Sequence, residues 1–594
     1  MGRSLLDKLR RFIGHERFVL VALALGLLLT APSVLTGLSA DDHIHRLWVQ
    51  KGGLCTDLFT FASGDPEVMR WQKSAGALPF WADDEMKISF FRPLASLSHC
   101  LDYRWFDGLP VLFHLENLAW FALAITTGFA FYRRTLGLPF AAGLATLFFA
   151  VDEGNGKVAG WIANRNLLMA TSFGLLTLVL HDRARREGSR KSAFGAVLAF
   201  GIALLSGEAA IATLAYLVSY ALFLDEGSWK ARLRSLLPHA LLLVPWQLAY
   251  RYLGHGQKGS AFYTNPLSDP LTFASNVVER APILLLSLLG GPQTDPYPLA
   301  GQDERQRWWL LAVGVLVVAA LFVAPLVRRS RQARFFAAGL VLAVLPACGT
   351  FPNDRVLMLA SVGGMGLLAS FVASAFADGL RLPRLLAQPL AGGLVLVHGI
   401  VAPVLQPLRS IDAARIEGDI GEVSRSLFHE AKPGDAVIAL NAGENMFTCT
   451  FANVLARELG YGQGVQAQCL SATAGPVSVV RIDPRRLVVR AEEGFFDPLK
   501  EPFWNAAEPM RKGHQLDLGW LRVTLLEVTE RGTPLEALFH FHYDLDDPAV
   551  HLRFLDPART AYVDAPVPPV GGKLVVADGK VVALETPRAR RGAR

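Results

Sequence analysis

Charged residues and cysteines are both scarce in this sequence. Only 19% of its 594 residues are Asp, Glu, Lys or Arg, whereas 52% are hydrophobic and the mean hydropathy is +0.32. Soluble globular chains carry about 25% charged residues, so most of this chain is not an ordinary soluble fold. The five cysteines form no Cys-x-x-Cys or Cys/His spacing, which argues against a zinc site.

The sequence also lacks a basic stripe interleaved with aromatic residues, the pattern of proteins that bind single-stranded nucleic acid. Its net charge of +6 comes from short basic clusters that lie between apolar runs. Such clusters orient membrane proteins, because Lys and Arg accumulate in cytoplasmic loops. We therefore expect membrane lipids, and no nucleic acid, among the partners of this chain.

Long apolar runs are abundant, and a helix needs about 20 apolar residues to cross the hydrocarbon core of a membrane. We predict about eleven spans, near residues 18–38, 111–131, 138–151, 160–180, 193–206, 208–224, 236–253, 308–326, 334–350, 355–376 and 387–407. Residues 271–292 are expected at the outer surface. This count places the basic loops on one side, as the positive-inside rule requires.

The first apolar run has two interpretations. Small residues end it at Leu38-Ser39-Ala40, which is a feature of cleaved signal peptides. The run is long for that role and many spans follow, so we favour an uncleaved anchor. The N-terminus is then cytoplasmic, and an odd number of spans places the C-terminal region outside, in the periplasm of a bacterial inner membrane.

The predicted fold is mainly α, a polytopic helix bundle over residues 1–410 with a large first outer loop at 39–110. From about Ile411 the composition becomes that of a soluble protein, and a smaller α/β or mostly β extracytoplasmic domain is expected over 411–587. Residues 588–594 are a basic tail that we expect to be disordered. Elements expected in the C-terminal domain are strands at 436–440, 477–482, 486–490, 521–528 and 574–577 and a helix at Asn445–Leu459.

Four cysteines fall in pairs under this topology. Cys55 and Cys100 share the first outer loop, and Cys449 and Cys469 share the C-terminal domain. Each pair could form a disulfide in an oxidising periplasm.

Two adjacent acids, Asp41 and Asp42, follow the first span directly. Ionisable residues beside spans cost a few kcal/mol unless they are paired, so they are functional candidates. One carboxylate can face a cavity while the other caps a helix or holds a cation. The alternative is that the turn is only a helix cap, because Asp is a favoured cap.

Further polar residues lie on or near the predicted outer side. Arg92 is fixed by the following Pro93 and suits a phosphate oxygen, whereas Glu208 interrupts a long apolar stretch. Snorkelling to lipid headgroups, hydrogen bonds between helices and surface ion pairs are the alternative explanations. Together these residues predict one polar cavity that opens outward; the candidate binding residues are Arg92, His114, Asn117, Arg165, Glu208 and Arg355.

Seven stretches, in order along the chain, carry a resemblance to a known family. They are Asp41-Asp42, FRPLASLSHCLDYRWF at 91–106, HLENLAW at 114–120, AGWIANRNLLMA at 159–170, LLSGEAA at 204–210, NPLSDPLTF at 265–273 and NDRVLMLASVGG at 353–364. Across roughly residues 15–380 the chain resembles the type C (GT-C) glycosyltransferases, most closely the O-mannosyltransferase-like membrane proteins.

The resemblance implies an inverting glycosyltransferase that moves a sugar from a polyprenyl-phosphate carrier to a periplasmic acceptor, which is a glycan, a lipid or a protein. It implies that Asp41 or Asp42 takes the proton of the acceptor hydroxyl. Arginines such as Arg92, Arg165 and Arg355 would stabilise the leaving phosphate. No cofactor is required, although a divalent cation (Mg or Mn) held by the two acids is an alternative.

The chain departs from the family at two motifs. It reads VDEGNGKVAGW at 151–161, where relatives commonly show two histidines and a glutamate, and Ser206-Gly207-Glu208 in place of Ser-Lys-Glu. These departures leave two alternative functions open. One is a catalytically inactive scaffold or sugar-binding protein, and the other is a transporter of lipid-linked sugars.

Overall fold

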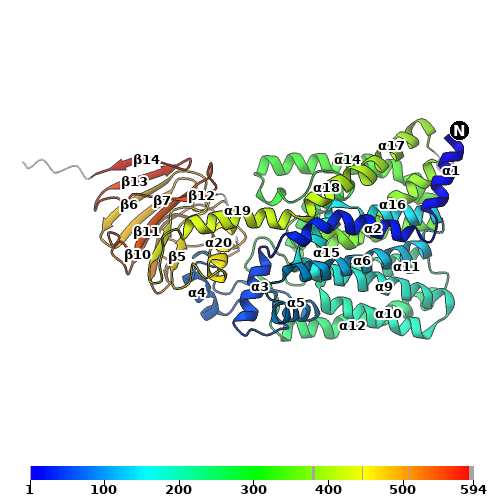
Figure 1. Ribbon diagram of the computed structural model, residues 1–594, viewed down its shortest axis with the longest axis horizontal. Helices are drawn as coiled ribbons and strands as arrows, with labels where there is room; N and C mark the ends of the chain where they lie inside the picture. The colour runs from blue at the N-terminus through cyan, green and yellow to red at the C-terminus, as the bar shows by residue number, and fades with distance from the viewer. Residues whose placement is uncertain (1, 378–381, 444–445, 506, 587–594) are drawn as a thin grey trace, which may run out of the picture. The chain divides into compact units, whose positions relative to one another are not determined.

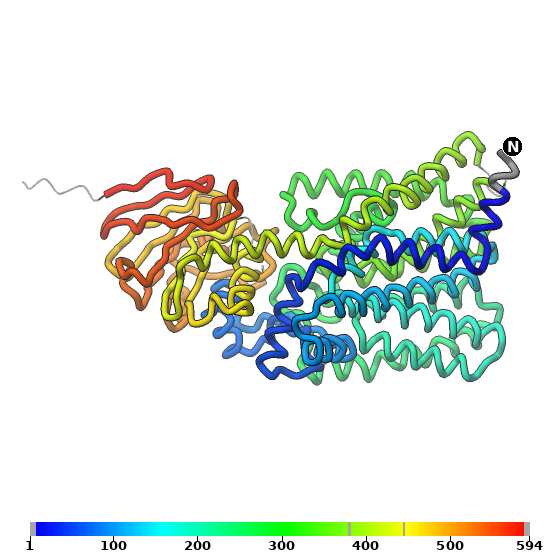
Figure 2. The backbone as a smooth tube through the Cα atoms, viewed as in Figure 1, coloured from blue at the N-terminus to red at the C-terminus, as the bar shows by residue number. Residues whose placement is uncertain are grey.

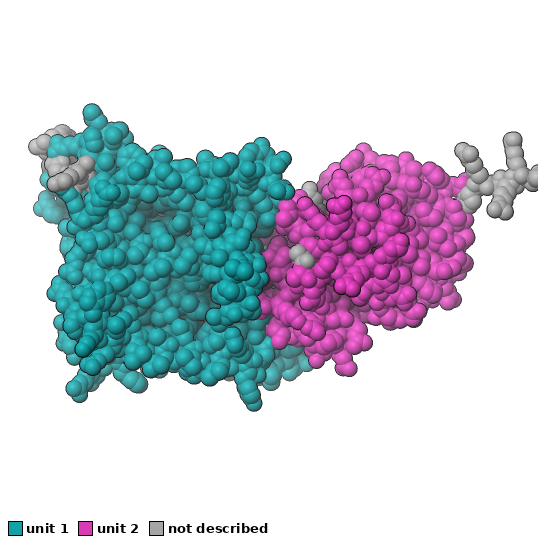
Figure 3. Space-filling model, turned by 180° about the vertical axis from the view of Figure 1, so that it is seen from behind, with its two compact units in different colours: residues 1–60, 90–256, 264–414 teal, residues 61–89, 257–263, 415–594 magenta. Residues whose placement is uncertain are grey.

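The computed structural model describes residues 2–377, 382–443, 446–505 and 507–586. The chain separates into two compact units (Figure 3). Unit 1 consists of Met1–Thr60, Phe90–Gly256 and Thr264–Ala414, and unit 2 of Phe61–Ser89, Gln257–Tyr263 and Arg415–Arg594. Two segments of the N-terminal region, 61–89 and 257–263, therefore belong to the same unit as the C-terminal region.

Unit 1 is a bundle of helices (Figure 1). Its helices are α1 (Gly2–Ile13), α2 (Phe18–Thr30), α3 (Asp41–Gln50), α5 (Pro93–Trp105), α6 (Pro110–Thr135), α7 (Pro139–Ala150), α8 (Glu153–Gly160), α9 (Arg165–Glu187), α10 (Arg190–Ser206), α11 (Ala212–Phe223), α12 (Trp229–Tyr252), α13 (Pro270–Leu288), α14 (Gln302–Arg329), α15 (Arg331–Ala347), α16 (Met358–Ala375), α17 (Arg384–Leu396) and α18 (Ala402–Ser410). Short 3-10 turns at Ala31–Leu35, Ile162–Asn164, Glu208–Ile211 and Asp354–Leu357 begin or extend several of them. In the backbone trace α2 runs alongside α6 (Figure 2).

Seven helices among the described residues are long and apolar enough to cross a membrane, which makes the chain a multi-pass membrane protein. They are Phe18–Leu35, Pro110–Thr135, Ile162–Glu187, Pro270–Leu288, Gln302–Arg329, Asp354–Ala375 and Arg384–Leu427. Six coincide with predicted spans. The other five predicted positions also carry helices, but four of these are short and α12 is interrupted by Pro238 and Pro245.

Helix α13 is the seventh apolar helix, although its residues were expected at the outer surface. Helix α13 forms hydrogen bonds with the segment between α15 and α16. Arg280 donates to the carbonyl oxygens of Cys348 and Thr350, at 3.2 and 2.8 Å. Ser287 donates to Asp354 at 2.6 Å. Two residues in the second half of α13 therefore contact the segment between α15 and α16.

The loops predicted to be cytoplasmic gather at one end of the bundle. Arg134 pairs with Asp182 at 2.6 Å, and Arg331 pairs with Glu226 at 3.4 Å. These pairs join the α6–α7 loop to the end of α9, and the α14–α15 loop to the α11–α12 loop. The grouping is the one that the alternation of basic loops predicted.

Unit 2 is mostly β, with one small α/β part. A seven-stranded antiparallel sheet has the order β14-β13-β6-β7-β10-β9-β8, and a four-stranded sheet has the order β12-β11-β4-β5. In the smaller sheet β4 is parallel to both neighbours, and α20 (Phe447–Glu458) connects β4 to β5. The strands are β4 (Ala436–Ala439), β5 (Gln466–Cys469), β6 (Val477–Asp483), β7 (Arg486–Ala491), β8 (Gln515–Asp517), β9 (Leu521–Val528), β10 (Pro534–Phe541), β11 (Val550–Asp556), β12 (Ala561–Asp564), β13 (Lys573–Ala577) and β14 (Lys580–Glu585).

All five predicted strands are present, as β4, β6, β7, β9 and β13, and the predicted helix is α20. Asn445, where that helix was expected to begin, and the tail 588–594 lie outside the described residues. The sequence did not identify β11. It lies between β12, which follows it directly along the chain, and β4, which is distant.

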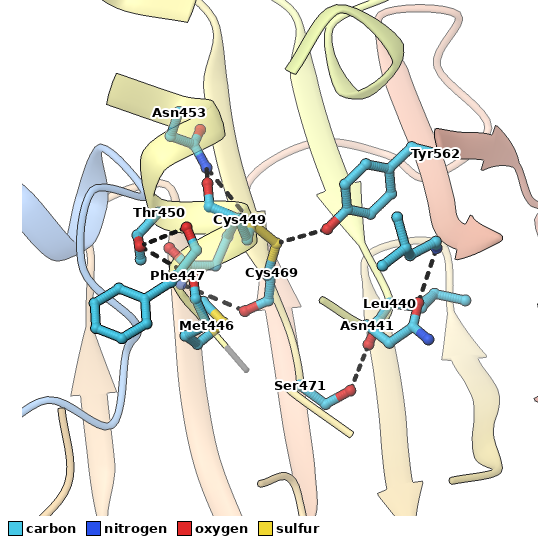
Figure 4. The surroundings of a disulfide bond; sticks show 12 residues. Leu440, Asn441, Met446, Phe447, Cys449, Thr450, Asn453, Cys469, Ser471 and Tyr562 are labelled. Atoms are coloured by element: carbon cyan, nitrogen blue, oxygen red, sulfur yellow. Dashed lines mark hydrogen bonds between the residues drawn. A yellow bond between two sulfur atoms is a disulfide. The ribbon is translucent and has the colours of Figure 1, made fainter. Parts of the chain in front are cut away.

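Both predicted disulfides are present. Cys55 joins Cys100, and Cys449 joins Cys469, with Cα atoms 5.4 and 6.6 Å apart. The first bond closes a loop of 45 residues, a constraint that the chain-entropy relation values at about 4 kcal/mol. The second links α20 to β5, and Figure 4 shows it beside the hydroxyl of Tyr562, which lies 3.5 Å from the Cys469 sulfur.

Unit 2 buries a carboxyl group, that of Glu501, which is only 1% exposed. One of its oxygens accepts a hydrogen bond from the backbone N–H of Phe503, at 3.1 Å. Burial raises the pKa of Glu501 to about 8. The folded protein therefore holds this group protonated at pH values where the unfolded chain ionises it.

We expect Glu501→Gln to remove a pH dependence of stability. Because the folded pKa lies above the unfolded value of about 4.3, the contribution is fully present below that value and is lost as the pH rises to about 8, by up to about 1.4 kcal/mol per pH unit. The midpoint of thermal unfolding of the wild-type protein in detergent should fall over this range more steeply than that of the variant. Parallel slopes would contradict the assignment.

Candidate active site

The acidic turn after the first span is held in an unusual backbone conformation. Ala40 has φ 49° and ψ −110°, a region that L-residues rarely adopt, and α3 begins at Asp41. The Ser39 N–H donates to Asp42 Oδ2 at 2.9 Å, and Tyr103 donates its hydroxyl to the backbone oxygen of Asp42 at 3.0 Å. Two acids in the first turn also suit the positive end of the α3 dipole.

The structure separates the roles of the two carboxylates. Asp42 is 1% exposed and is occupied by the Ser39 N–H, and burial raises its pKa to about 8. Asp41 is half-buried. Burial raises the pKa of Asp41, and the Arg355 and Arg92 guanidinium groups oppose that shift. Asp42 therefore stabilises the turn, while Asp41 lies in the field of two arginines and is accessible to a ligand.

Arg92 approaches this site from the start of α5. Its Nε donates to Glu208 Oε2 at 2.7 Å, and its guanidinium lies 4.3 Å from the ring centroid of Phe90 and 4.8 Å from that of Phe59. Glu208 follows α10 at the break that the sequence showed in its apolar stretch. Both side chains of the pair are about one-fifth exposed, so Arg92 has both a fixed orientation and access to the surface.

Arg355 lies in the turn before α16 and has few polar partners. Its Nη1 donates to Asn164 at 3.4 Å, and its guanidinium stacks 4.9 Å from the ring centroid of Trp161. A stacked guanidinium keeps its edge N–H groups available for oxygen ligands. Arg355 is half-buried, so this edge can serve an anion next to Asp41.

Arg165 was predicted to bind phosphate, and the structure contradicts this. The side chain is 0% exposed. Its partners are Asn117 at 2.8 Å, Ser98 at 2.7 Å, Asp102 at 2.5 Å, Glu116 at 2.8 Å and the Phe113 carbonyl at 3.1 Å. These contacts use the guanidinium on every side and leave no surface for a ligand. Arg165 is a structural tie between α5, α6 and α9.

His114 and Asn117 were also predicted to bind substrate, and they too hold the scaffold. His114 is 2% exposed, and its Nε2 lies 2.9 Å from the Gly37 carbonyl oxygen and 3.2 Å from the Thr36 hydroxyl. Asn117 is fully buried and donates to the Trp161 carbonyl at 2.9 Å. Both residues face protein because α6 turns their shared face toward neighbouring segments, which spacing along one helix cannot reveal.

A second polar cluster surrounds a cavity of about 90 Å³. Asp152, Glu153, Asp354 and His398 line it. Arg409 bonds Asp354 at 2.8 Å and also Asp295, which in turn pairs with Lys157. Burial raises the pKa of Asp152 to about 6 and that of Glu153 to about 7.

The residues of this cluster were not among the predicted site residues. The acids of the 151–161 motif were visible as a departure from the family, but an acidic loop is usually explained by solvation. Arg409 follows the last predicted span directly, and only the fold brings it to Asp354, 55 residues earlier.

The two acids of the opening turn do not converge on one point. Asp42 Oδ2 accepts the Ser39 N–H, whereas Asp41 lies in the field of Arg355 and Arg92, which opposes the rise in its pKa. Over the ranges that the structure describes, no group of three or more His, Cys, Asp or Glu is arranged to hold a metal ion.

No protein-family model matches the sequence, and no curated protein matches it. Solved structures do match. ArnT from Cupriavidus metallidurans bound to undecaprenyl phosphate has 14% identity and a TM-score of 0.39, over 76% of this chain and 89% of that one. An Archaeoglobus fulgidus oligosaccharyltransferase tethered to an acceptor peptide has 12% identity and a TM-score of 0.40, over 75% of this chain and 64% of that one.

Both are GT-C glycosyltransferases, the superfamily that the sequence motifs resemble.

The different roles of Arg165 and Arg355 can be tested by paired substitutions. Arg165→Gln leaves Asp102 buried without its partner, and breaking such a pair costs about 3–5 kcal/mol. Arg355→Gln removes a half-exposed cation and should change stability by less than about 1 kcal/mol. Thermal unfolding of the detergent-solubilised protein measures both, and equal stability of the two variants would contradict the structural role of Arg165.

Proposed function

We propose that the chain is an inverting glycosyltransferase that transfers a sugar from a polyprenyl-phosphate carrier to an acceptor hydroxyl. The observation that supports this proposal is that the guanidinium groups of Arg355 and Arg92 both act on the Asp41 carboxyl and oppose the rise in its pKa that burial causes. A carboxylate with an elevated pKa accepts a proton well. Two arginines that keep donors accessible suit a phosphate oxygen.

Each group has one role in the proposed step. The acceptor oxygen attacks the anomeric carbon from the face opposite the phosphate, and the acceptor proton passes to Asp41. The bond between the anomeric carbon and the phosphate oxygen breaks, and its electron pair leaves with the polyprenyl phosphate. Arg92 and Arg355 stabilise the charge that develops on this phosphate. The positive charge that stabilises the leaving phosphate therefore comes from these two arginine side chains.

Glu208 orients Arg92 in this proposal. A carboxylate 2.7 Å from the guanidinium Nε fixes the arginine while leaving its terminal nitrogens for other partners. The family motif carries a lysine at the position of Gly207, and this chain relies on the arginines instead. The departure at 206–208 is therefore compatible with phosphate binding.

The proposed location is a bacterial inner membrane with the site and unit 2 on the periplasmic side. The basic loops that gather at the opposite end of the bundle favour this orientation, because Lys and Arg accumulate on the cytoplasmic side. Two disulfides also favour an oxidising compartment. The donor then reaches the site from the outer leaflet.

Asparagine substitutions of the two acids should have unequal effects. Asp41→Asn removes the proton acceptor, so the kcat of sugar transfer should fall by about 10²-fold or more. Asp42→Asn keeps an oxygen that accepts the Ser39 N–H, and its kcat should stay within a few-fold of wild type. Purified protein, a radiolabelled polyprenyl-phosphate sugar and a panel of acceptors provide the measurement.

Two results would contradict the proposal. If Asp41→Asn transferred sugar with the wild-type kcat, Asp41 would not be the proton acceptor. Absence of transfer by the wild-type protein with every donor and acceptor, while it still binds or moves the carrier, would favour a scaffold or a transporter instead.

A further inference from the structure

One short segment, Trp161–Asn164, contacts both halves of the candidate site. The indole N–H of Trp161 donates to the Ser39 carbonyl oxygen at 3.1 Å, two residues before Asp41. The ring of the same tryptophan supports the Arg355 guanidinium at 4.9 Å. Asn164 accepts a hydrogen bond from that guanidinium at 3.4 Å. The Trp161 side chain therefore links the acidic turn to Arg355.

Hydrogen bonds from buried residues of α6 and α9 fix the backbone of this segment. Asn117 donates to the Trp161 carbonyl at 2.9 Å, and Asn117 is itself held by the buried Arg165 at 2.8 Å. The N–H of Asn164 also returns to the Trp161 carbonyl, at 3.0 Å. Trp161 thus has a fixed backbone and presents two different surfaces, an N–H edge and an aromatic face.

Ala40 supplies the second, independent observation. Its φ of 49° with ψ of −110° is a conformation in which glycine costs nothing and alanine is strained. Strain of this kind persists only where surrounding contacts impose it. Here the contacts are on Ser39, whose carbonyl accepts from Trp161 and whose N–H donates to Asp42. The strained residue immediately precedes Asp41.

We propose that Trp161 and the strained Ala40 are positioning residues that aim the Asp41 carboxylate. This inference rests on the proposed function. The indole N–H anchors Ser39, the strained peptide then directs the start of α3, and the indole face keeps Arg355 at the same site. The N–H edge acts on the acid, and the aromatic face acts on the arginine.

The two surfaces can be separated by substitution. Trp161→Phe keeps an aromatic face for Arg355 but loses the N–H, so kcat should fall about tenfold while KM for the lipid donor stays near wild type. Trp161→Leu loses both surfaces, and KM for the donor should then rise as well. Trp246→Phe is the matched control, because that indole also donates to a backbone carbonyl, of Leu204 at 3.2 Å, and should leave both constants near wild type.

Ala40→Gly gives the sharpest test. If Ala40 had a purely structural role, a more stable variant would not lose kcat. Relief of the strained conformation should raise the midpoint of thermal unfolding, while the freed turn should lower kcat about tenfold. Wild-type kcat in both Ala40→Gly and Trp161→Phe would overturn the inference. A fall in kcat that merely follows a fall in stability would overturn it too.

Hydrogen–deuterium exchange distinguishes failure of this inference from failure of the proposed function. Amides of residues 39–43 should exchange faster in Ala40→Gly and Trp161→Phe than in wild type, whether or not sugar is transferred. A wild-type protein without transferase activity would refute the proposed function alone. Unchanged exchange in these amides would refute the positioning role.

Discussion

The hydrogen bonds of the Arg165 guanidinium are the interactions on which the structure around the acidic turn depends. A fully buried cation beside a membrane is tolerable only when its donors are matched, and here Asp102, Glu116 and Asn117 match it from two helices. The same network fixes the Trp161 backbone through Asn117. The scaffold beneath the acidic turn is therefore held by charge-assisted hydrogen bonds in addition to the packing of apolar helices.

Structural and functional charged groups differ in how many hydrogen-bond partners they have within the protein. Arg165 has partners on every side, whereas Arg355 has one long hydrogen bond and an aromatic face. Asp42 accepts a backbone N–H with one oxygen, Oδ2, whereas Asp41 lies in the field of the Arg355 and Arg92 guanidinium groups. Asp41, Arg92 and Arg355 each keep some exposure, and an acid with two cations suits proton removal and phosphate stabilisation. The rest of the polar network holds that set in place.

The sequence predicted the helix positions well, because apolar runs and basic loops are local signals that the membrane enforces. It also predicted five strands and both disulfides. It failed where the direction of a side chain decides the role, as for Arg165. It also failed to select Asp152 and Arg409, because their neighbours come from distant parts of the chain. The difference between the two adjacent acids became visible only from the burial of Asp42 and its hydrogen bond with the Ser39 N–H.

The central claim is that Arg92 and Arg355 receive the phosphate of a polyprenyl carrier beside Asp41. The most direct test is a structure of the protein with polyprenyl phosphate bound in a lipid environment. The account predicts phosphate oxygens within about 3.5 Å of both guanidinium groups, close enough for hydrogen bonds. A phosphate bound elsewhere, for example beside Lys157 and Arg409, would contradict it.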